Sequence, residues 1–195
     1  LPVPSGFIVS TYAYREALFS LGLDREIEAT LSNRTMETPE AAEAASRHIA
    51  GLLSRHSVPA ALTEEIFRAY GMLCEKLSHG SEIAVAVRSS ATAEDLAEAS
   101  FAGQQETYLN ITGPERVAHA VRDCWASLFS PRALLYRSQR SGLPSGSLAM
   151  AVGVQVMVPA RVAGVLFTVN PRTGDPSELV IEASWGLGES VVGGS

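Results

Sequence analysis

Cysteine is scarce in this chain: only Cys74 and Cys124 occur among its 195 residues, and there is no Cys-x-x-Cys pair. No histidine lies near either thiol at the spacing of metal ligands, which favours two reduced thiols in the core over a zinc or redox site. The N-terminal residues lack the basic stretch and apolar block of a signal peptide, and every apolar run is too short to cross a membrane. The expected location is therefore cytoplasmic.

Charged side chains are also few. They make up 18% of the chain against 46% hydrophobic residues, and the formal net charge is −6. A surface with so few charged residues has two explanations. Part of it packs on something outside this chain, or the sequence simply favours Ala and Gly. The negative sign excludes a protein held to nucleic acid by bulk positive charge, and we expect neither nucleic acid nor a membrane as a partner. A phosphate-bearing ligand would need a few placed cations and backbone amides.

The order of the periodic segments predicts an α+β fold. Helical patterns fill the chain up to about residue 77, and Thr38-Pro39 is a strong helix-start signal. The continuous apolar run 83–87 predicts a strand buried on both faces. Residues 148–158 and 162–169 alternate like two strands, which predicts an antiparallel hairpin. Helices followed by mixed strands and helices favour α+β, with a subdomain division near 80–112 that has no linker signature.

Arg88 follows the apolar run 83–87, at the end of the predicted strand, where open α/β sheets tend to place ligands. Three hydroxyl groups come within the next four residues: Ser89, Ser90 and Thr92. A guanidinium with hydroxyls and backbone amides suits a triphosphate, because it offers bidentate charge and many donors. The alternative is a capped turn in which Arg88 forms a salt bridge with Glu94 or Asp95.

The polar stretch from Ser100 to Thr107 separates two predicted strands. Gly103 lacks a Cβ, so a ligand or another chain segment can approach its backbone closely. Thr107 begins a strand with its hydroxyl toward one face. A polar loop of this length is more often functional than decorative, and a flexible surface loop is the alternative.

Gln155 is the odd residue in a valine-rich strand. Its amide is buried with a partner, lines a cleft, or faces water on the wet side of an antiparallel sheet. An amide can read the edge of an adenine ring with one donor and one acceptor. Glu189 follows a Gly-Leu-Gly turn, which is only a weak phosphate-loop signal because no Gly-Lys-Ser/Thr comes after it.

No catalytic residue and no metal site is expected in this chain. The four histidines form no Ser-His-Asp or His-x-x-x-His arrangement; they are His48, His56, His79 and His119. The carboxylates of Glu94 and Asp95 are adjacent in sequence, and adjacent side chains diverge.

Two stretches together resemble a known family. They are Ala-Val-Arg-Ser-Ser-Ala-Thr-Ala-Glu-Asp-Leu at 86–96 and Ala-Ser-Phe-Ala-Gly-Gln-Gln-Glu-Thr-Tyr-Leu-Asn at 99–110. Both look like the nucleotide-binding domain of phosphoenolpyruvate synthase and of its relative, rifampicin phosphotransferase. Supporting matches at 3–7, 154–157, 164–167 and 183–189 extend the resemblance over essentially the whole chain. Pyruvate phosphate dikinase belongs to the wider family, but its loop differs after Arg-Ser, so it is the less similar member.

The resemblance implies an ATP-grasp fold, in which two α/β subdomains grip ATP. It implies that ATP phosphorylates a His on a separate swivelling domain, which then serves an acceptor-substrate domain that takes pyruvate or rifampicin. Carried over motif to motif, Arg88 would contact the phosphates, and Gly103 and Thr107 would line the triphosphate site. Gln155 would lie beside adenine. The remaining ATP-binding candidates are Ser89, Ser90, Thr92 and Glu189.

Two parts of the family pattern are not in this sequence. In the family, a Gly-Gly-Lys segment that meets the phosphates precedes the Pro-Ser-Gly-Phe stretch. A Glu and a Gln that hold Mg²⁺, and then an Arg, come beyond the last residue here. We therefore expect a chain truncated at both ends that alone binds ATP weakly and turns nothing over, because phosphoryl transfer rests on positioning and charge neutralisation. The alternatives are a catalytically silent nucleotide-binding module and a structural domain without a ligand.

Overall fold

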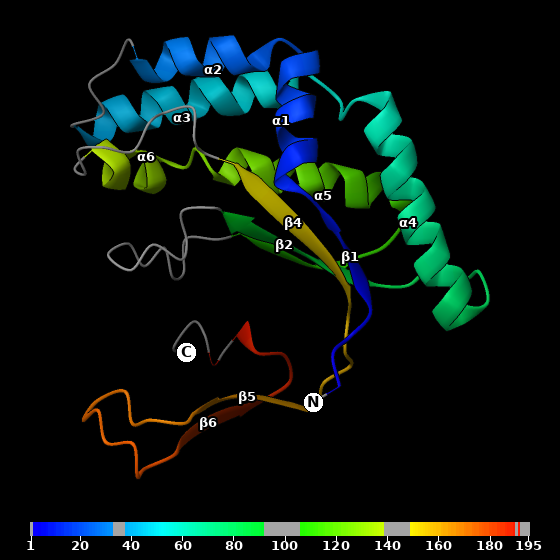
Figure 1. Ribbon diagram of the computed structural model, residues 1–195, viewed down its shortest axis with the longest axis vertical. Coiled ribbons are helices and arrows are strands. Elements are labelled where there is room, and N and C mark those ends of the chain that lie inside the picture. The colour runs from blue at the N-terminus through cyan, green and yellow to red at the C-terminus, as the bar shows by residue number, and fades with distance from the viewer. Residues whose placement is uncertain (1, 33–37, 92–105, 139–148, 190, 192–195) are drawn as a thin grey trace. The chain divides into compact units, whose positions relative to one another are not determined.

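The computed structural model describes residues 2–32, 38–91, 106–138, 149–189 and 191. Figure 1 shows the helices and strands of this part of the chain. Their bounds, in chain order, are β1 (Gly6–Val9), α1 (Thr11–Ser20), α2 (Leu23–Ser32), α3 (Pro39–Ser54), α4 (Ala60–Ser78), β2 (Val85–Ala91), β3 (Thr107–Ile111), α5 (Pro114–Ser127), α6 (Pro131–Ser138), β4 (Met150–Val156), β5 (Val162–Phe167) and β6 (Val180–Trp185).

Side-chain caps begin three of the described helices, α1, α3 and α6, and at α6 the hydroxyl of Ser130 accepts from the N–H of Ala133. The hydroxyl of Thr38 accepts a hydrogen bond from the backbone N–H of Ala41 at 3.3 Å, and Pro39 is the first residue of α3. The hydroxyl of Ser10 does the same for Ala13 at the start of α1. Each cap satisfies one N–H group that a helix start leaves without an intrahelical partner. The start signal at Thr38-Pro39 is confirmed.

Four strands form an antiparallel sheet in the order β1-β4-β2-β3. On one face, Val85 and Val87 of β2 and Val152 and Val154 of β4 are at most 1% exposed. Helix α5 packs against β2, β3 and β4. The opposite face carries exposed side chains, among them Arg88. The alternation along β4 places Val152 and Val154 on this core face and Gly153 and Gln155 on the other.

Strand β2 differs from the strand predicted over 83–87. It begins at Val85 and continues to Ala91, so Arg88 is its fourth residue and does not stand at its end. Val85 and Val87 are fully buried and Ala86 is 8% exposed, but Arg88 is exposed. The burial expected for the run holds at Val85, Ala86 and Val87, whereas the part of the strand beyond the run has one open face, as an antiparallel sheet allows.

The chain divides into two compact units, Leu1–Met157 and Val158–Ser195. The first unit contains the four-stranded sheet and α1 to α6, and the second contains the antiparallel pair β5-β6. The predicted hairpin of 148–158 with 162–169 is wrong, because β4 pairs with β1 and β2 while β5 pairs with β6. The subdomain division expected near 80–112 falls inside the first unit, where β2 and β3 are neighbouring strands.

The prediction of an α+β fold is confirmed for the described residues, whose strand pairs are antiparallel in both sheets. Both cysteines are free and buried, as expected for core thiols. Within the described ranges, no helix has the length and apolar character needed to cross a bilayer.

Candidate functional site

The open face of the four-stranded sheet brings together residues from all four strands. Gly153 of β4 lies opposite Ile8 of β1 on one side and opposite Arg88 of β2 on the other. Thr107 of β3 lies opposite Arg88. Residues that are directly opposed in an antiparallel sheet share a face. Ile8, Gly153, Arg88 and Thr107 therefore form one row across the sheet.

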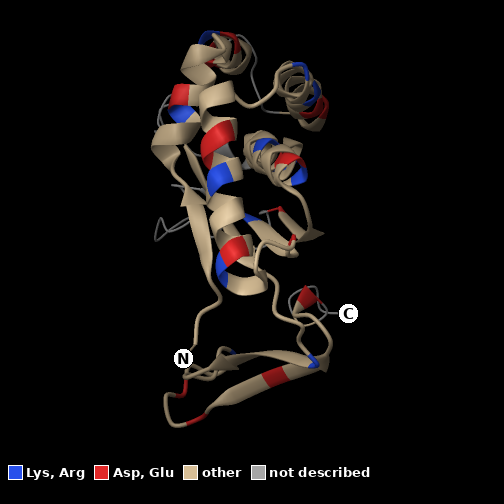
Figure 2. Ribbon diagram, turned by 90° about the vertical axis from the view of Figure 1, so that its right-hand side faces the viewer, with Lys and Arg blue, Asp and Glu red and all other residues tan. Residues whose placement is uncertain are grey.

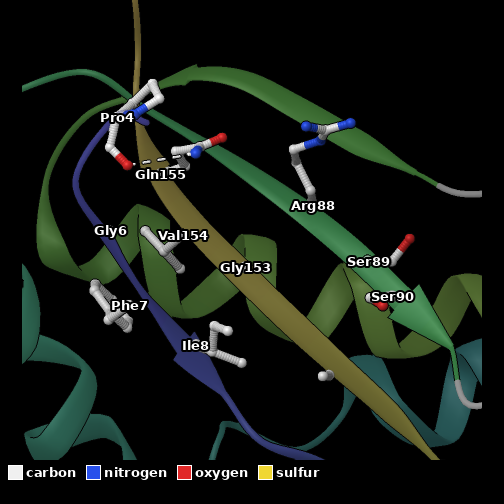
Figure 3. Close-up of a pocket in the computed structure, with 11 residues that line it drawn as sticks. Pro4, Gly6, Phe7, Ile8, Arg88, Ser89, Ser90, Gly153, Val154 and Gln155 are labelled. Atoms are coloured by element: carbon white, nitrogen blue, oxygen red, sulfur yellow. Dashed lines mark hydrogen bonds between the residues drawn. The ribbon is translucent and has the colours of Figure 1, made fainter. Parts of the chain in front are cut away.

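A second row runs beside the first. Gln155 lies two residues beyond Gly153 on β4, and it pairs with Gly6 of β1 and Ala86 of β2. Both partners are too small to rise far above the backbone. The amide of Gln155 therefore lies between two positions with little or no side chain, on the same face as Arg88 (Figure 3).

The two rows border a hollow of about 550 Å³ in the first unit. Its lining residues are Pro4, Gly6, Phe7, Ile8, Arg88, Ser89, Ser90, Ala151, Gly153, Val154 and Gln155. This volume is within the range of small-molecule sites, which is about 300–1,000 Å³. Thr107 lies one strand beyond this lining, in the same row as Arg88.

Arg88 supplies the positive charge of the hollow. Its side chain is exposed, and the ion pair found among the described residues joins Arg122 to Asp123 instead. The alternative partners of Arg88, Glu94 and Asp95, lie outside the described residues. Within the described part of the chain, the guanidinium donors of Arg88 are available to a ligand. Along the helices, acidic and basic positions are interspersed (Figure 2), so the placement of single cations matters more than a basic field.

Gln155 is half-buried and lines the hollow. Its Nε2 donates a hydrogen bond to the carbonyl oxygen of Pro4 at 3.5 Å, drawn as a dashed line in Figure 3. Since a carbonyl can only accept, this contact assigns the nitrogen to the Pro4 side of the amide. The sequence left three environments for Gln155: buried with a partner, lining a cleft, or facing water. In the structure it lines a cleft.

The two serines after Arg88 point to opposite faces of the sheet. Ser90 is exposed and pairs with Ala151 on the open face. Ser89 is 5% exposed, and its hydroxyl donates to the carbonyl oxygen of Glu106 at 3.2 Å. Ser90 can therefore meet a ligand through its side chain, whereas the hydroxyl of Ser89 is already bonded within the sheet.

Among the described residues, no charged side chain is buried beneath the hollow. Cys124 of α5 is fully buried, and its Sγ lies 4.0 Å from the carbonyl oxygen of Val87. Burial, together with the charges of Asp123 and Glu106, raises the pKa of the Cys124 thiol to about 12. The thiol is therefore neutral at physiological pH and adds no charge under Arg88.

Three predicted site residues remain: Thr92, Gly103 and Glu189. Thr92 and Gly103 lie outside the described residues. Glu189 is exposed in the second unit. In the ranges that the structure describes, no three His, Cys, Asp or Glu side chains gather into a possible metal site. The described residues therefore do not offer a set of ligands that fits Mg²⁺, and none of them is assigned as a magnesium ligand.

Reasoning from the sequence missed the contribution of β1 to the site. Pro4, Gly6 and Ile8 line the hollow because β1 pairs with β4, a strand from the far end of the first unit. The available signal was Gly153, since a glycine inside a strand often marks the close approach of a ligand or another backbone.

The whole chain, residues 1–195, matches the family model described as pyruvate phosphate dikinase, AMP/ATP-binding domain. The chain belongs to this family. The resemblance seen in the sequence is thereby confirmed, and the open hollow is the candidate nucleotide site of an AMP/ATP-binding domain.

Curated relatives similar to this chain are named as phosphoenolpyruvate synthases and as a rifampicin phosphotransferase. The chain is 50% identical over 195 residues to a probable phosphoenolpyruvate synthase of Methanocaldococcus jannaschii. It is 43% identical over 197 residues to a phosphoenolpyruvate synthase of Helicobacter pylori and 44% identical over 193 residues to a rifampicin phosphotransferase of Streptomyces sp. These alignments cover 98–100% of this chain but only 16%, 24% and 21% of the respective relatives.

Proposed function

We propose that this chain is the ATP-binding domain of a phosphoenolpyruvate synthase-like phosphotransferase. The observation that supports the proposal best is the row across the open face, in which Arg88 lies between Gly153 and Thr107, with Gln155 beside it. A triphosphate needs placed positive charge and several donors, and an adenine edge suits an amide. The match of the entire chain to an AMP/ATP-binding family supports the same assignment.

In this proposal, Arg88 binds the phosphates, and the hydroxyls of Thr107 and Ser90 donate to them. Gln155 lies against the base. Gly103, Thr92 and Glu189 complete the ATP-binding set, and Ser89 contributes through its position in β2. ATP passes a phosphoryl group to a His on a separate swivelling domain, and that domain passes it to pyruvate. The work of this chain is to position the nucleotide and balance its charge.

Arg88→Ala in the full-length protein tests the proposal. Hydrogen bonds to charged groups contribute about 1.5–3 kcal/mol, so we expect the ATP affinity measured by calorimetry to fall roughly 10- to 100-fold. Arg68→Ala is the matched control, because it removes the same charge from an exposed position on α4. Unchanged ATP affinity in Arg88→Ala would contradict the proposal and favour a structural domain without a ligand.

The substrate that accepts the phosphoryl group needs a separate test. The sequence identity of the chain to the rifampicin phosphotransferase is 44% and to the Helicobacter pylori synthase 43%, so identity does not distinguish the two acceptors. The full-length protein is given labelled ATP and then either pyruvate or rifampicin. We expect an acid-labile phosphohistidine whose label moves to pyruvate. Transfer to rifampicin would assign the other branch, and ATP binding without phosphohistidine would indicate a catalytically silent module.

A further inference from the structure

Gly153 occupies a place where glycine is unfavourable and where the packing of the described residues does not require it. It is the fourth of seven residues in β4, an interior strand of the sheet. Glycine weakens a strand because it loses more backbone freedom on folding and has no side chain to pack. The φ of Gly153 is not positive, so its backbone conformation is open to other residues. A Cβ added here would have the carbonyl oxygen of Arg88 as its nearest neighbour, at 4.0 Å.

At two other glycines in strands, Gly6 and Gly164, the neighbouring strand leaves no room for a Cβ atom. A Cβ at Gly6 would collide with the carbonyl oxygen of Val154. A Cβ at Gly164 would lie 2.6 Å from the carbonyl oxygen of Glu182. Neighbouring strands therefore fix both of these glycines. Since no described residue crowds Gly153 in this way, we look for the reason for glycine there in what approaches the open face of the sheet.

The neighbours of Gly153 shape a trough along β4. Ile8, which is 73% exposed, stands on the β1 side, and the exposed Arg88 stands on the β2 side (Figure 3). Gln155 lies two residues along the same strand and on the same face. Gly153 is therefore the low point between Ile8 and Arg88, and it adjoins both the side chain assigned to the phosphates, across the strand pair, and the side chain assigned to the base, along its own strand.

We propose that Gly153 is a specificity-determining residue that lets the sugar-proximal part of a nucleotide lie against the backbone of β4. Any side chain at this position would fill the trough and displace the ligand, so size and not charge decides the effect. The inference rests on the proposed function, because it requires a nucleotide in this hollow.

Substitutions that enlarge residue 153 test the inference in the full-length protein. ATP affinity is measured by calorimetry and thermal unfolding by scanning calorimetry for the unsubstituted protein, Gly153→Ala and Gly153→Val. We expect Gly153→Ala to melt at or above the unsubstituted protein. We expect its ATP affinity to fall about tenfold, since one added methyl group in a fitted pocket has an effect of this size. Gly153→Val should bind ATP more weakly still.

Gly71→Ala is the matched control. Gly71 is exposed on α4, and no described residue lies within 4 Å of an added Cβ. This variant should also melt at or above the unsubstituted protein, but it should bind ATP normally. Normal ATP affinity in both Gly153 variants would overturn the inference and leave the proposed function in place. A loss of affinity that only parallels a lowered melting temperature would also overturn it, because the glycine would then serve the fold. If the unsubstituted protein binds no ATP, the proposed function fails first and the inference fails with it.

Discussion

Arg88 on β2 and Thr107 on β3 are direct partners in the sheet, and both side chains are exposed on its open face. The Cβ atoms of such partners are about 5 Å apart. At that separation, the guanidinium and the hydroxyl can contact the same phosphate group. This pairing brings together two residues that the sequence placed in different motifs.

Thr107→Val tests whether this pair acts on a ligand. Valine keeps the β-branched shape that suits a strand but removes the hydroxyl donor. We expect the ATP affinity of the full-length protein to fall about tenfold, because a hydrogen bond to a charged group is lost, while its melting temperature stays the same. Thr30→Val on α2 is the control. Unchanged affinity in Thr107→Val would remove Thr107 from the proposed site.

Ser89 and Ser90 should separate stability from binding. Ser89→Ala removes the buried hydroxyl that donates to Glu106, so we expect the free energy of unfolding to fall by about 1 kcal/mol. Ser90→Ala removes a hydroxyl from the open face, so we expect weaker ATP binding at unchanged stability. Denaturant unfolding and calorimetry measure the two effects. The reverse pattern would mean that β2 presents its other face to the ligand.

Local signals predicted much of this fold. The cap and proline at Thr38-Pro39 marked a helix start because they act on the nearest backbone N–H groups. The alternation in β4 separated Val152 and Val154 from Gly153 and Gln155 because side chains in a strand alternate between faces. The sequence also placed Thr107 at the start of a strand, as β3 shows.

Long-range pairing could not be predicted in the same way. The turn after β4 suggested a hairpin with β5, but β4 inserts between β1 and β2. Strand partners are chosen by the whole hydrophobic face that is buried, and not by the nearest turn. For the same reason, the part of the hollow formed by Pro4, Gly6 and Ile8 could not be found before the pairing of β1 was known.

The hydroxyl of Tyr70 forms hydrogen bonds with the residues that precede β2 and α5. Its side chain is 2% exposed; the hydroxyl donates to the carbonyl oxygen of Ile83 at 2.7 Å and accepts from the N–H of Gly113 at 3.1 Å. Tyr70→Phe leaves both backbone groups without this partner. We therefore expect the free energy of unfolding to fall by about 1–3 kcal/mol in denaturant titrations. Tyr12→Phe, at a side chain that is 71% exposed, should change it little. Equal stability of the two variants would contradict this role.

Cys124 should make the protein sensitive to alkali. Burial raises the pKa of its thiol from 9.0 to about 12, and the charges of Asp123 and Glu106 add to the effect. In the unfolded chain the thiol ionises near pH 9, whereas in the folded chain it stays protonated. The stability that this group contributes is therefore complete below pH 9 and declines as the pH rises toward 12, by roughly 1.4 kcal/mol per pH unit. Thiol reagents at pH 8 should label Cys124 only after unfolding.

Cys124→Ala distinguishes this effect from general alkaline damage. The variant loses some stability at every pH because of the smaller side chain, but its free energy of unfolding should fall less steeply between pH 9 and 10.5 than that of the unsubstituted protein. Part of the slope should persist above pH 10, since burial, and after it the charges of Glu106 and Asp123, keep the pKa of Tyr108 above its usual value of 10.0 in this variant too. Denaturant titrations at four pH values give both slopes. Parallel slopes would show that the buried thiol does not control alkaline stability, because only a group that titrates differently in the folded and unfolded chains changes the slope.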